Sequence, residues 1–359
     1  MKKCDILYIC GTLDYGHSVS GNYILYYLFS KLEKKYNINY IGLWKYQQIQ
    51  KYNSENFIYF EDSLKQKTNA ELDAIIPEHK ILFLSGDDLT NSQLEYLHKK
   101  FNNKVVVCAM TSWLFGCTTQ YPELYDDLTG DVAKNRYETY KRINAHIVHV
   151  SSYSQKVQDQ SLFPSVGSSI IPLPFEQIKS TSYPSMPTST NKIILWGTTQ
   201  PQRRRKGLKE FEEILKIFKE KYPERSNIEI HTVGPPPHLQ SPFNVVDKGS
   251  LDREGIARTY QESDVFALTT LADSGPMMAA ESIKNNTPLV SFNTNVSMDI
   301  TYNGINGYTV DSNEDFADKL YVILYESNFE ISHDFIKKFN SEEIVLNKYQ
   351  NLFNGILNK

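Results

Sequence analysis

Short runs of β-branched and other apolar residues alternate along the first half of the chain with stretches whose apolar positions recur at helical spacing. Residues 5–10 form the first run, and in the stretch 21–35 the side chains of Ile24, Leu25 and Leu28 share one helical face. Further strands are predicted at 81–84, 104–108, 147–150 and 169–171, with helices at 93–101 and 132–143. This alternation predicts a parallel sheet wrapped by helices.

A segment rich in Ser, Thr and Pro interrupts this pattern at 176–191 and fits neither periodicity. We therefore predict a first domain at 1–178, a linker at 179–191 and a second domain at 192–339. The alternation restarts in the second domain, with strands predicted at 192–196, 228–233, 265–270 and 288–292 and helices at 207–221, 253–261 and 276–284. The predicted fold class is α/β, with two doubly wound Rossmann-like domains that face a central cleft.

Three helical stretches are predicted after residue 311. The last, at about 340–359, carries apolar residues at helical spacing, among them Val345, Tyr349 and Phe353. Because these residues need a partner surface, we expect this helix to pack back on the first domain.

Composition and charge exclude several classes of protein. The chain has 38 Lys and Arg against 42 Asp and Glu, and this net charge of -4 argues against a nucleic-acid binder. No apolar run approaches the ~18 residues of a membrane span, and Asp5 interrupts the basic start of the chain. Neither a transmembrane helix nor an export signal is expected, which predicts a cytoplasmic protein. The four cysteines lack C-x-x-C spacing and are expected to be reduced and mostly buried.

The segment 264–281 carries the first candidate chemistry. Its strand runs into a tight loop, and Pro276 stands where a helix can begin. The free amides of that helix's first turn, with the backbone of Gly275, can bind an anion. Asp273 and Glu281 flank this site, and their carboxylates can accept hydrogen bonds from sugar hydroxyls. On spacing alone, a helix cap at Asp273 and a solvated Glu281 fit equally well.

A cluster of basic residues, Arg203, Arg204, Arg205 and Lys206, precedes the helix predicted from Gly207. Cations at a helix N-terminus oppose its dipole, so the cluster calls for an anionic partner. A diphosphate is such a partner, because Arg can bind two oxygens and Lys adds a point charge. Arg205 and Lys206, next to the glycine, are the candidate ligands; for the other two we prefer a solvated interpretation.

These motifs resemble those of retaining GT-B-fold glycosyltransferases of family four, of the bacterial surface-polysaccharide type. The resemblance rests on Arg205-Lys206-Gly207, on Asp273 through Glu281, and on 288–292 and 306–308. It covers most of residues 191–310. It implies that the acidic pair, usually two glutamates, contacts the donor sugar and the nucleotide ribose, while the Arg-Lys pair neutralises the diphosphate. Asp273, Arg205 and Lys206 are thereby implied as catalytic.

The full donor site that the resemblance implies comprises Gly197, Thr198, Arg205, Lys206, Gly234, Asp273, Ser274, Gly275, Pro276, Met277 and Glu281. The amino-terminal half resembles the family more weakly. There the resemblance implies an acceptor side that comprises Gly11, Thr12, Asp14, His17, Met110 and Trp113. In this alignment Met110 occupies the position of a histidine, and Thr198 stands where an arginine is frequent.

The resemblance implies a retaining transfer of a sugar from a nucleotide diphosphate-sugar, with a UDP-sugar favoured, to a glycan or lipid-linked saccharide in cell-surface polysaccharide synthesis. It also implies peripheral association at the inner membrane face. No nucleic-acid partner and no cofactor are expected. The alternative is a non-catalytic partner subunit that binds nucleotide-sugar without turnover, which the departures at Met110 and Thr198 motivate.

The sequence contains no Asp-x-Asp pair, the motif expected of metal-dependent nucleotide-sugar enzymes, and it offers Arg205 and Lys206 instead. We therefore predict that transfer is metal-independent, with activity unchanged in excess EDTA. Loss of activity that manganese or magnesium restores would contradict this prediction.

Overall fold

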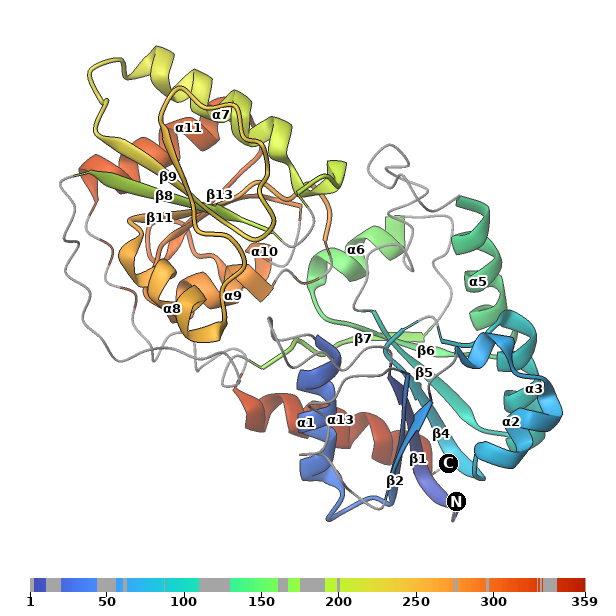
Figure 1. Ribbon diagram of the computed structural model, residues 1–359. Helices are drawn as coiled ribbons and strands as arrows, with labels where there is room; N and C mark the ends of the chain where they lie inside the picture. The colour runs from blue at the N-terminus through green and yellow to red at the C-terminus, as the bar shows by residue number, and fades with distance from the viewer. Residues whose placement is uncertain are drawn as a thin grey trace. The chain divides into compact units, whose positions relative to one another are not determined.

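The computed structural model describes residues 3–10, 21–43, 56–60, 63–86, 88–109, 130–160, 167–174, 191–198, 201–273, 275, 277–294, 297–327, 329, 331 and 341–358. These residues form two compact units. One holds the described residues up to Pro174 together with those from Glu342 onward, and the other holds those from Asn191 to Ser341. Each unit has its own parallel sheet (Figure 1). The predicted linker, apart from Asn191, lies outside the described residues.

The first unit has its strands in the order β3-β2-β1-β4-β5-β6-β7, so the chain starts mid-sheet, reaches one edge and then crosses to the other side. The strands are β1 (Cys4–Cys10), β2 (Ile38–Leu43), β3 (Phe57–Phe60), β4 (His79–Leu84), β5 (Lys104–Ala109), β6 (His146–His149) and β7 (Gly167–Ile170). The helices are α1 (Gly21–Leu32), the short η2 (Leu64–Gln66), α2 (Asn69–Ile75), α3 (Asn91–Phe101), α5 (Gly130–Arg142), α6 (Ser152–Gln160) and α13 (Glu342–Leu357). The unit is therefore doubly wound.

Alternating side chains of the first sheet pack on both of its faces. Leu7 and Leu82 belong to a buried cluster to which α2, α3 and α5 also contribute. On the neighbouring positions, Tyr8 pairs in register with Phe83, and both rings contact Phe29 of α1. The near-continuous apolar character of these strands follows from this burial on two sides.

The C-terminal helix α13 belongs to the first unit, although it follows the second unit in the sequence. The ring of Phe353 is fully buried and lies 5.5 Å from that of Phe29 and 6.2 Å from that of Phe83. The hydroxyl of Tyr36 donates to Asn354 Oδ1 at 2.8 Å, and Lys31 forms an ion pair with Glu342. An apolar stripe and flanking polar contacts thus fix α13 against α1 (Figure 1).

The second unit has its strands in the order β10-β9-β8-β11-β12-β13. They are β8 (Lys192–Gly197), β9 (Ile228–Val233), β10 (Asn244–Asp247), β11 (Val265–Leu268), β12 (Leu289–Phe292) and β13 (Gly307–Val310). The helices are the short η5 (Arg204–Lys206), α7 (Leu208–Lys221), α8 (Arg253–Glu262), α9 (Met277–Lys284), α10 (Ser297–Ile300), α11 (Asn313–Tyr321) and the π-helical η6 (Val322–Glu326). The apolar residues of α7 and α11 cover one face of this sheet, and those of α8 and α9 cover the other.

Most predicted strands and helices are present within a few residues of their predicted bounds. Not predicted from the sequence were the strands β2, β3, β10 and β13, the helices α2, α6 and α10, and the short η2 and η5, of which the longest is α6 with nine residues. The described cysteines Cys4, Cys10 and Cys108 are buried and free, as expected, and burial raises the pKa of Cys4 and of Cys108 to about 12. Cys117 lies outside the described residues. Within the described ranges, no helix has both the length and the apolar character that a bilayer span requires.

The burial of α13 generates a prediction for stability. Phe353→Ala removes a ring from a fully buried aromatic cluster and should lower the free energy of unfolding of the first unit by about 3–5 kcal/mol. Ile344 is 37% exposed on the same helix, so Ile344→Ala should cost less than about 1 kcal/mol. Urea unfolding followed by circular dichroism measures both. Equal costs for the two variants would show that α13 does not contribute to this core.

Candidate functional site

The carboxyl edge of the second sheet is where the sequence-predicted donor residues gather. The chain leaves β8 for β9 on one side and returns, after β10, to β11 on the other side of β8. The segments after β8 and β11 therefore diverge from neighbouring strand ends, and open α/β sheets bind ligands at such a point. Gly197 ends β8 and Thr198 follows it, Gly234 follows β9, and Asp273 follows β11.

The turn that carries Arg205 and Lys206 is fastened to the segment after β11. Gly207 has a φ of 74°, and a Cβ there would lie 1.8 Å from the carbonyl oxygen of Thr269. The backbone N–H of Leu271 donates to the Arg205 carbonyl at 2.8 Å. Only glycine permits this approach, because a side chain at that position would collide with backbone atoms.

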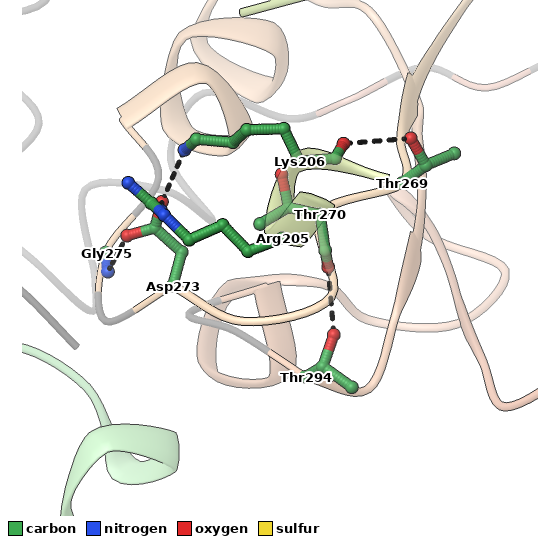
Figure 2. A network of polar contacts seen from close by, with 7 residues as sticks. All are labelled: Arg205, Lys206, Thr269, Thr270, Asp273, Gly275 and Thr294. Atoms are coloured by element: carbon green, nitrogen blue, oxygen red, sulfur yellow. Dashed lines mark hydrogen bonds and ion pairs between the residues drawn. The ribbon is translucent and has the colours of Figure 1, made fainter. Parts of the chain in front are cut away.

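Threonine hydroxyls strengthen the same junction. Thr269 Oγ1 accepts a hydrogen bond from Trp196 Nε1 at 2.9 Å and donates to the Lys206 carbonyl at 3.4 Å. Thr294, in the segment after β12, donates its hydroxyl to the Thr270 carbonyl at 2.9 Å (Figure 2). None of these three threonines was predicted as a site residue; the signal that points to them is hydroxyl residues at the ends of predicted strands or just after them.

Asp273 binds both predicted cations, as Figure 2 shows. Its Oδ2 accepts from Lys206 Nζ at 2.6 Å and from Arg205 Nη1 at 3.0 Å, and its Oδ1 lies 3.4 Å from the backbone N of Gly275. The side chains are 15–20% exposed, so the cluster is partly buried and still reachable from solvent. The structure thus brings together residues 67 and 68 positions apart in the sequence.

The electrostatics of this cluster favour an ionised carboxylate. Burial alone would raise the pKa of Asp273, but the charges of Lys206 and Arg205, with the Gly275 N–H, lower it to about 2. The three side chains together carry a net charge of +1. The ammonium of Lys206 and the guanidinium of Arg205 retain further N–H groups, so the cluster can bind an anion beside Asp273.

Arg204, for which the sequence favoured a solvated interpretation, is partly exposed and pairs with an acidic residue. Its guanidinium binds the two carboxylate oxygens of Glu210 at 2.6 and 2.5 Å, with a side-chain exposure of 36%. Glu210 lies in the first turn of α7, where the helix dipole also favours an acidic residue. This pairing was not predicted from the sequence. Arg204 therefore stabilises the turn through Glu210, whereas Arg205 and Lys206 bind Asp273.

Glu281 lies on α9, one turn after the helix begins at Met277. Its side chain is partly buried, and no described residue donates a hydrogen bond to its carboxylate. Burial raises its pKa from the ordinary 4.5 to about 7, although the charge of Arg253 opposes this shift. A ligand that donates hydroxyl hydrogen bonds would favour the charged form of this group.

The predicted glycines at this edge have packing roles. A Cβ at Gly234, whose φ is 108°, would lie 2.1 Å from the Thr198 carbonyl oxygen. A Cβ at Gly197 would lie 2.9 Å from the Val233 carbonyl oxygen and 3.0 Å from Met278 Cε of α9. These glycines let the strand ends and α9 approach closely. Gly307, in the motif 306–308, likewise lets its backbone approach the Leu289 carbonyl oxygen, which a Cβ there would reach at 2.0 Å.

Other predicted site residues lie outside the described part of the chain. On the donor side these are Ser274 and Pro276. On the acceptor side they are Gly11, Thr12, Asp14, His17, Met110 and Trp113. Within the described ranges, no three His, Cys, Asp or Glu side chains gather in a way that could hold a metal ion.

Comparison with known proteins gives a match within the second unit. Residues 201–340 match the family model described as "Glycosyl transferases group 1". This segment includes Arg205, Lys206, Asp273 and Glu281. No curated protein sequence matches the chain significantly.

Solved structures resemble both units over nearly the full length. Sucrose-phosphate synthase from Thermosynechococcus elongatus matches with a TM-score of 0.72 and 12% identity, covering 98% of this chain and 99% of that one. A glycosyltransferase from Rickettsia africae gives 0.67 and 14%, with 99% of each chain covered. The Anabaena protein HepE, solved in complex with UDP and glucose, gives 0.69 and 12%, covering 98% and 99%. At these identities the likeness shows the fold: two Rossmann-like domains of the GT-B type, which confirms the predicted fold class.

The raised pKa of Glu281 predicts a pH-dependent stability. Because the folded protein holds this proton more tightly than the unfolded chain, the stabilisation is fully present below pH 4.5 and is lost as the pH rises through about 7. Glu281→Gln, neutral throughout, should therefore exceed the wild type in free energy of unfolding by about 1–3 kcal/mol at pH 8 and by little at pH 4.5.

Denaturant titrations at both pH values measure this difference. Glu220→Gln, at an exposed position of α7, is the control and should follow the wild type. If the effect of Glu281→Gln were the same at both pH values, Glu281 would not hold a perturbed proton.

Proposed function

We propose that this chain is a retaining, metal-independent glycosyltransferase of family four that transfers a sugar from a nucleotide diphosphate-sugar. The observation that carries the proposal is the cluster of Arg205, Lys206 and Asp273 at the switch point of the second sheet. The match of this unit to the glycosyltransferase group 1 model supports it. Two cations beside a carboxylate suit a ligand that is anionic at one end and rich in hydroxyls at the other.

The chemical need in such a transfer is to stabilise the diphosphate as it departs. The bond between the anomeric carbon and the phosphate oxygen breaks, a bond from the acceptor oxygen forms on the same face, and the acceptor's proton passes to the departing phosphate. Charge therefore grows on the phosphate oxygens, where the remaining N–H groups of Arg205 and Lys206 can donate. These cations take the place of a metal ion, and no protein nucleophile is assigned.

The two carboxylates have different roles in this proposal. Asp273 orients the donor sugar, because among the described residues its Oδ1 has only a long contact, to the Gly275 N–H, and can accept from a sugar hydroxyl. Glu281 accepts from the ribose hydroxyls, which would supply the hydrogen bonds that its partly buried carboxylate lacks among the described residues. The first turn of α9 adds backbone amides for the phosphates.

We further propose a UDP-sugar as the donor and a glycan or lipid-linked saccharide of cell-surface polysaccharide synthesis as the acceptor. The UDP and glucose bound to HepE support the choice of nucleotide. Cytoplasmic location with peripheral association at the inner membrane face belongs to the same proposal. Incubation with a panel of nucleotide-sugars and acceptors, read by nucleotide release, tests the activity, and proton NMR of the product's anomeric centre tests retention.

Thr198, at a position where the resembled family frequently has arginine, favours a second candidate: a partner subunit that binds nucleotide-sugar without turnover. Its hydroxyl cannot replace a guanidinium at a diphosphate. The same panel separates the two candidates. Binding detected by thermal shift without nucleotide release from any donor would favour the partner subunit.

The proposed roles predict different kinetic defects. Lys206 faces charge that grows during bond breaking, so Lys206→Ala should lower kcat more than it weakens donor binding. Glu281 contacts ribose before and during reaction, so Glu281→Gln should mainly raise the KM for the donor. Each loss should reach about 10–100-fold in kcat/KM, since a hydrogen bond to a charged group is worth about 1.5–3 kcal/mol.

Steady-state kinetics on folded variants provides the measurement. Lys209→Ala removes a cation from an exposed position three residues further along and should stay within about twofold of the wild type. Activity within about twofold for both Lys206→Ala and Glu281→Gln would mean that these residues are structural, and the donor-site assignment would fail.

A further inference from the structure

Both cations of the proposed donor site share one carboxylate oxygen. Lys206 Nζ lies 2.6 Å and Arg205 Nη1 lies 3.0 Å from Asp273 Oδ2. A residue that only oriented a sugar would not need to bind the cations that receive the diphosphate. In the protein without ligand, Asp273 is therefore their internal counter-ion.

This arrangement opposes the binding of any anion. A phosphate oxygen that accepts a hydrogen bond from Lys206 would lie about 4–5 Å from Asp273 Oδ2, given ordinary hydrogen-bond lengths at a tetrahedral nitrogen. Two like charges at that separation in a partly buried site repel each other. The repulsion requires no movement of Asp273, because the cations retain N–H groups for both partners.

An intact nucleotide-sugar offsets this repulsion, whereas a free diphosphate does not. Among the described residues, the only further donor to Asp273 Oδ1 is the Gly275 N–H at 3.4 Å, which is longer than an ordinary N–H···O bond and leaves room for a second donor. A sugar hydroxyl attached to the diphosphate can be that donor. A nucleoside diphosphate or inorganic pyrophosphate brings the negative charge without the hydroxyl.

We propose that Asp273 makes the site selective for the intact nucleotide-sugar over free nucleoside diphosphate, by holding Arg205 and Lys206 as their counter-ion. The proposal rests on the donor site of the proposed function. Its consequence is that the product nucleotide binds less tightly than the two cations alone would allow, which favours its release. Asp273 thus acts through the cations on affinity, in addition to its contact with the sugar.

The test measures binding of free diphosphates to the full chain by isothermal titration calorimetry. The probes are UDP and inorganic pyrophosphate, with the wild type, Asp273→Asn and Lys206→Ala. Asp273→Asn should bind both probes about tenfold more tightly than the wild type, because a carboxylate is removed from beside the bound charge. The gain should shrink as salt rises, since it is electrostatic. Lys206→Ala should lower the affinity for both probes.

Two controls make the result specific. Glu210→Gln removes a carboxylate from the same turn, where it pairs with Arg204, and should leave the affinity for UDP within about twofold of the wild type. Asp273→Ser is a second variant that removes the charge of Asp273, and its hydroxyl can still accept from the Gly275 N–H. It replaces Asp273→Asn if that protein does not fold. Structural damage would weaken binding, so tighter binding identifies the counter-ion role.

The outcomes separate this inference from the proposed function. Diphosphate binding that is lost in Lys206→Ala and unchanged or weaker in the neutral Asp273 variants would overturn the inference and leave the donor site intact. Absence of diphosphate binding in every variant would overturn both. If Glu210→Gln increased the affinity for diphosphate as much as the Asp273 variants do, the inference would also be overturned, because the increase would then be a general effect of net charge.

Discussion

The contact between Gly207 and the carbonyl of Thr269 is the constraint on which the candidate site depends. Two segments that follow neighbouring strands, β8 and β11, meet there with no room for a Cβ atom. The hydrogen bond from Leu271 N–H to the Arg205 carbonyl fixes their register. Because the backbones are held so closely, two long cationic side chains from one segment reach the short carboxylate of the other. The site's charges are thus positioned by backbone packing.

Charge balance within the turn follows from the same geometry. Arg204 is neutralised by Glu210 of α7, whereas Arg205 and Lys206 share Asp273 and keep a net charge of +1. The turn would otherwise place three cations at the start of a helix, where the dipole disfavours them. Local pairing therefore makes residues 204–206 compatible with the start of a helix and leaves a net charge of +1 on the group formed by Arg205, Lys206 and Asp273.

The sequence predicted the sheets well where strands are buried on both faces, as at 5–10 and 104–108, because continuous apolar runs mark them. It missed β2 (Ile38–Leu43) and β10 (Asn244–Asp247), because polar residues interrupt their apolar pattern and pairing with neighbouring strands determines them. The site residues Arg205, Lys206 and Asp273 were predicted from motif and resemblance. Their mutual ion pairs were not, because they depend on a tertiary contact between segments far apart in the sequence.

Packing separates two kinds of predicted site residue. Gly197 and Gly234 have contacts that exclude a side chain, so the fold alone accounts for glycine at both positions. The fold does not explain Arg205, Lys206 and Asp273 in the same way. Removing three charges partly from water costs about as much free energy as their mutual attraction contributes, so apolar side chains at these positions would give similar stability. A cluster that the fold does not need agrees with the proposed donor site, because its net positive charge and the adjacent first turn of α9 suit an anionic ligand.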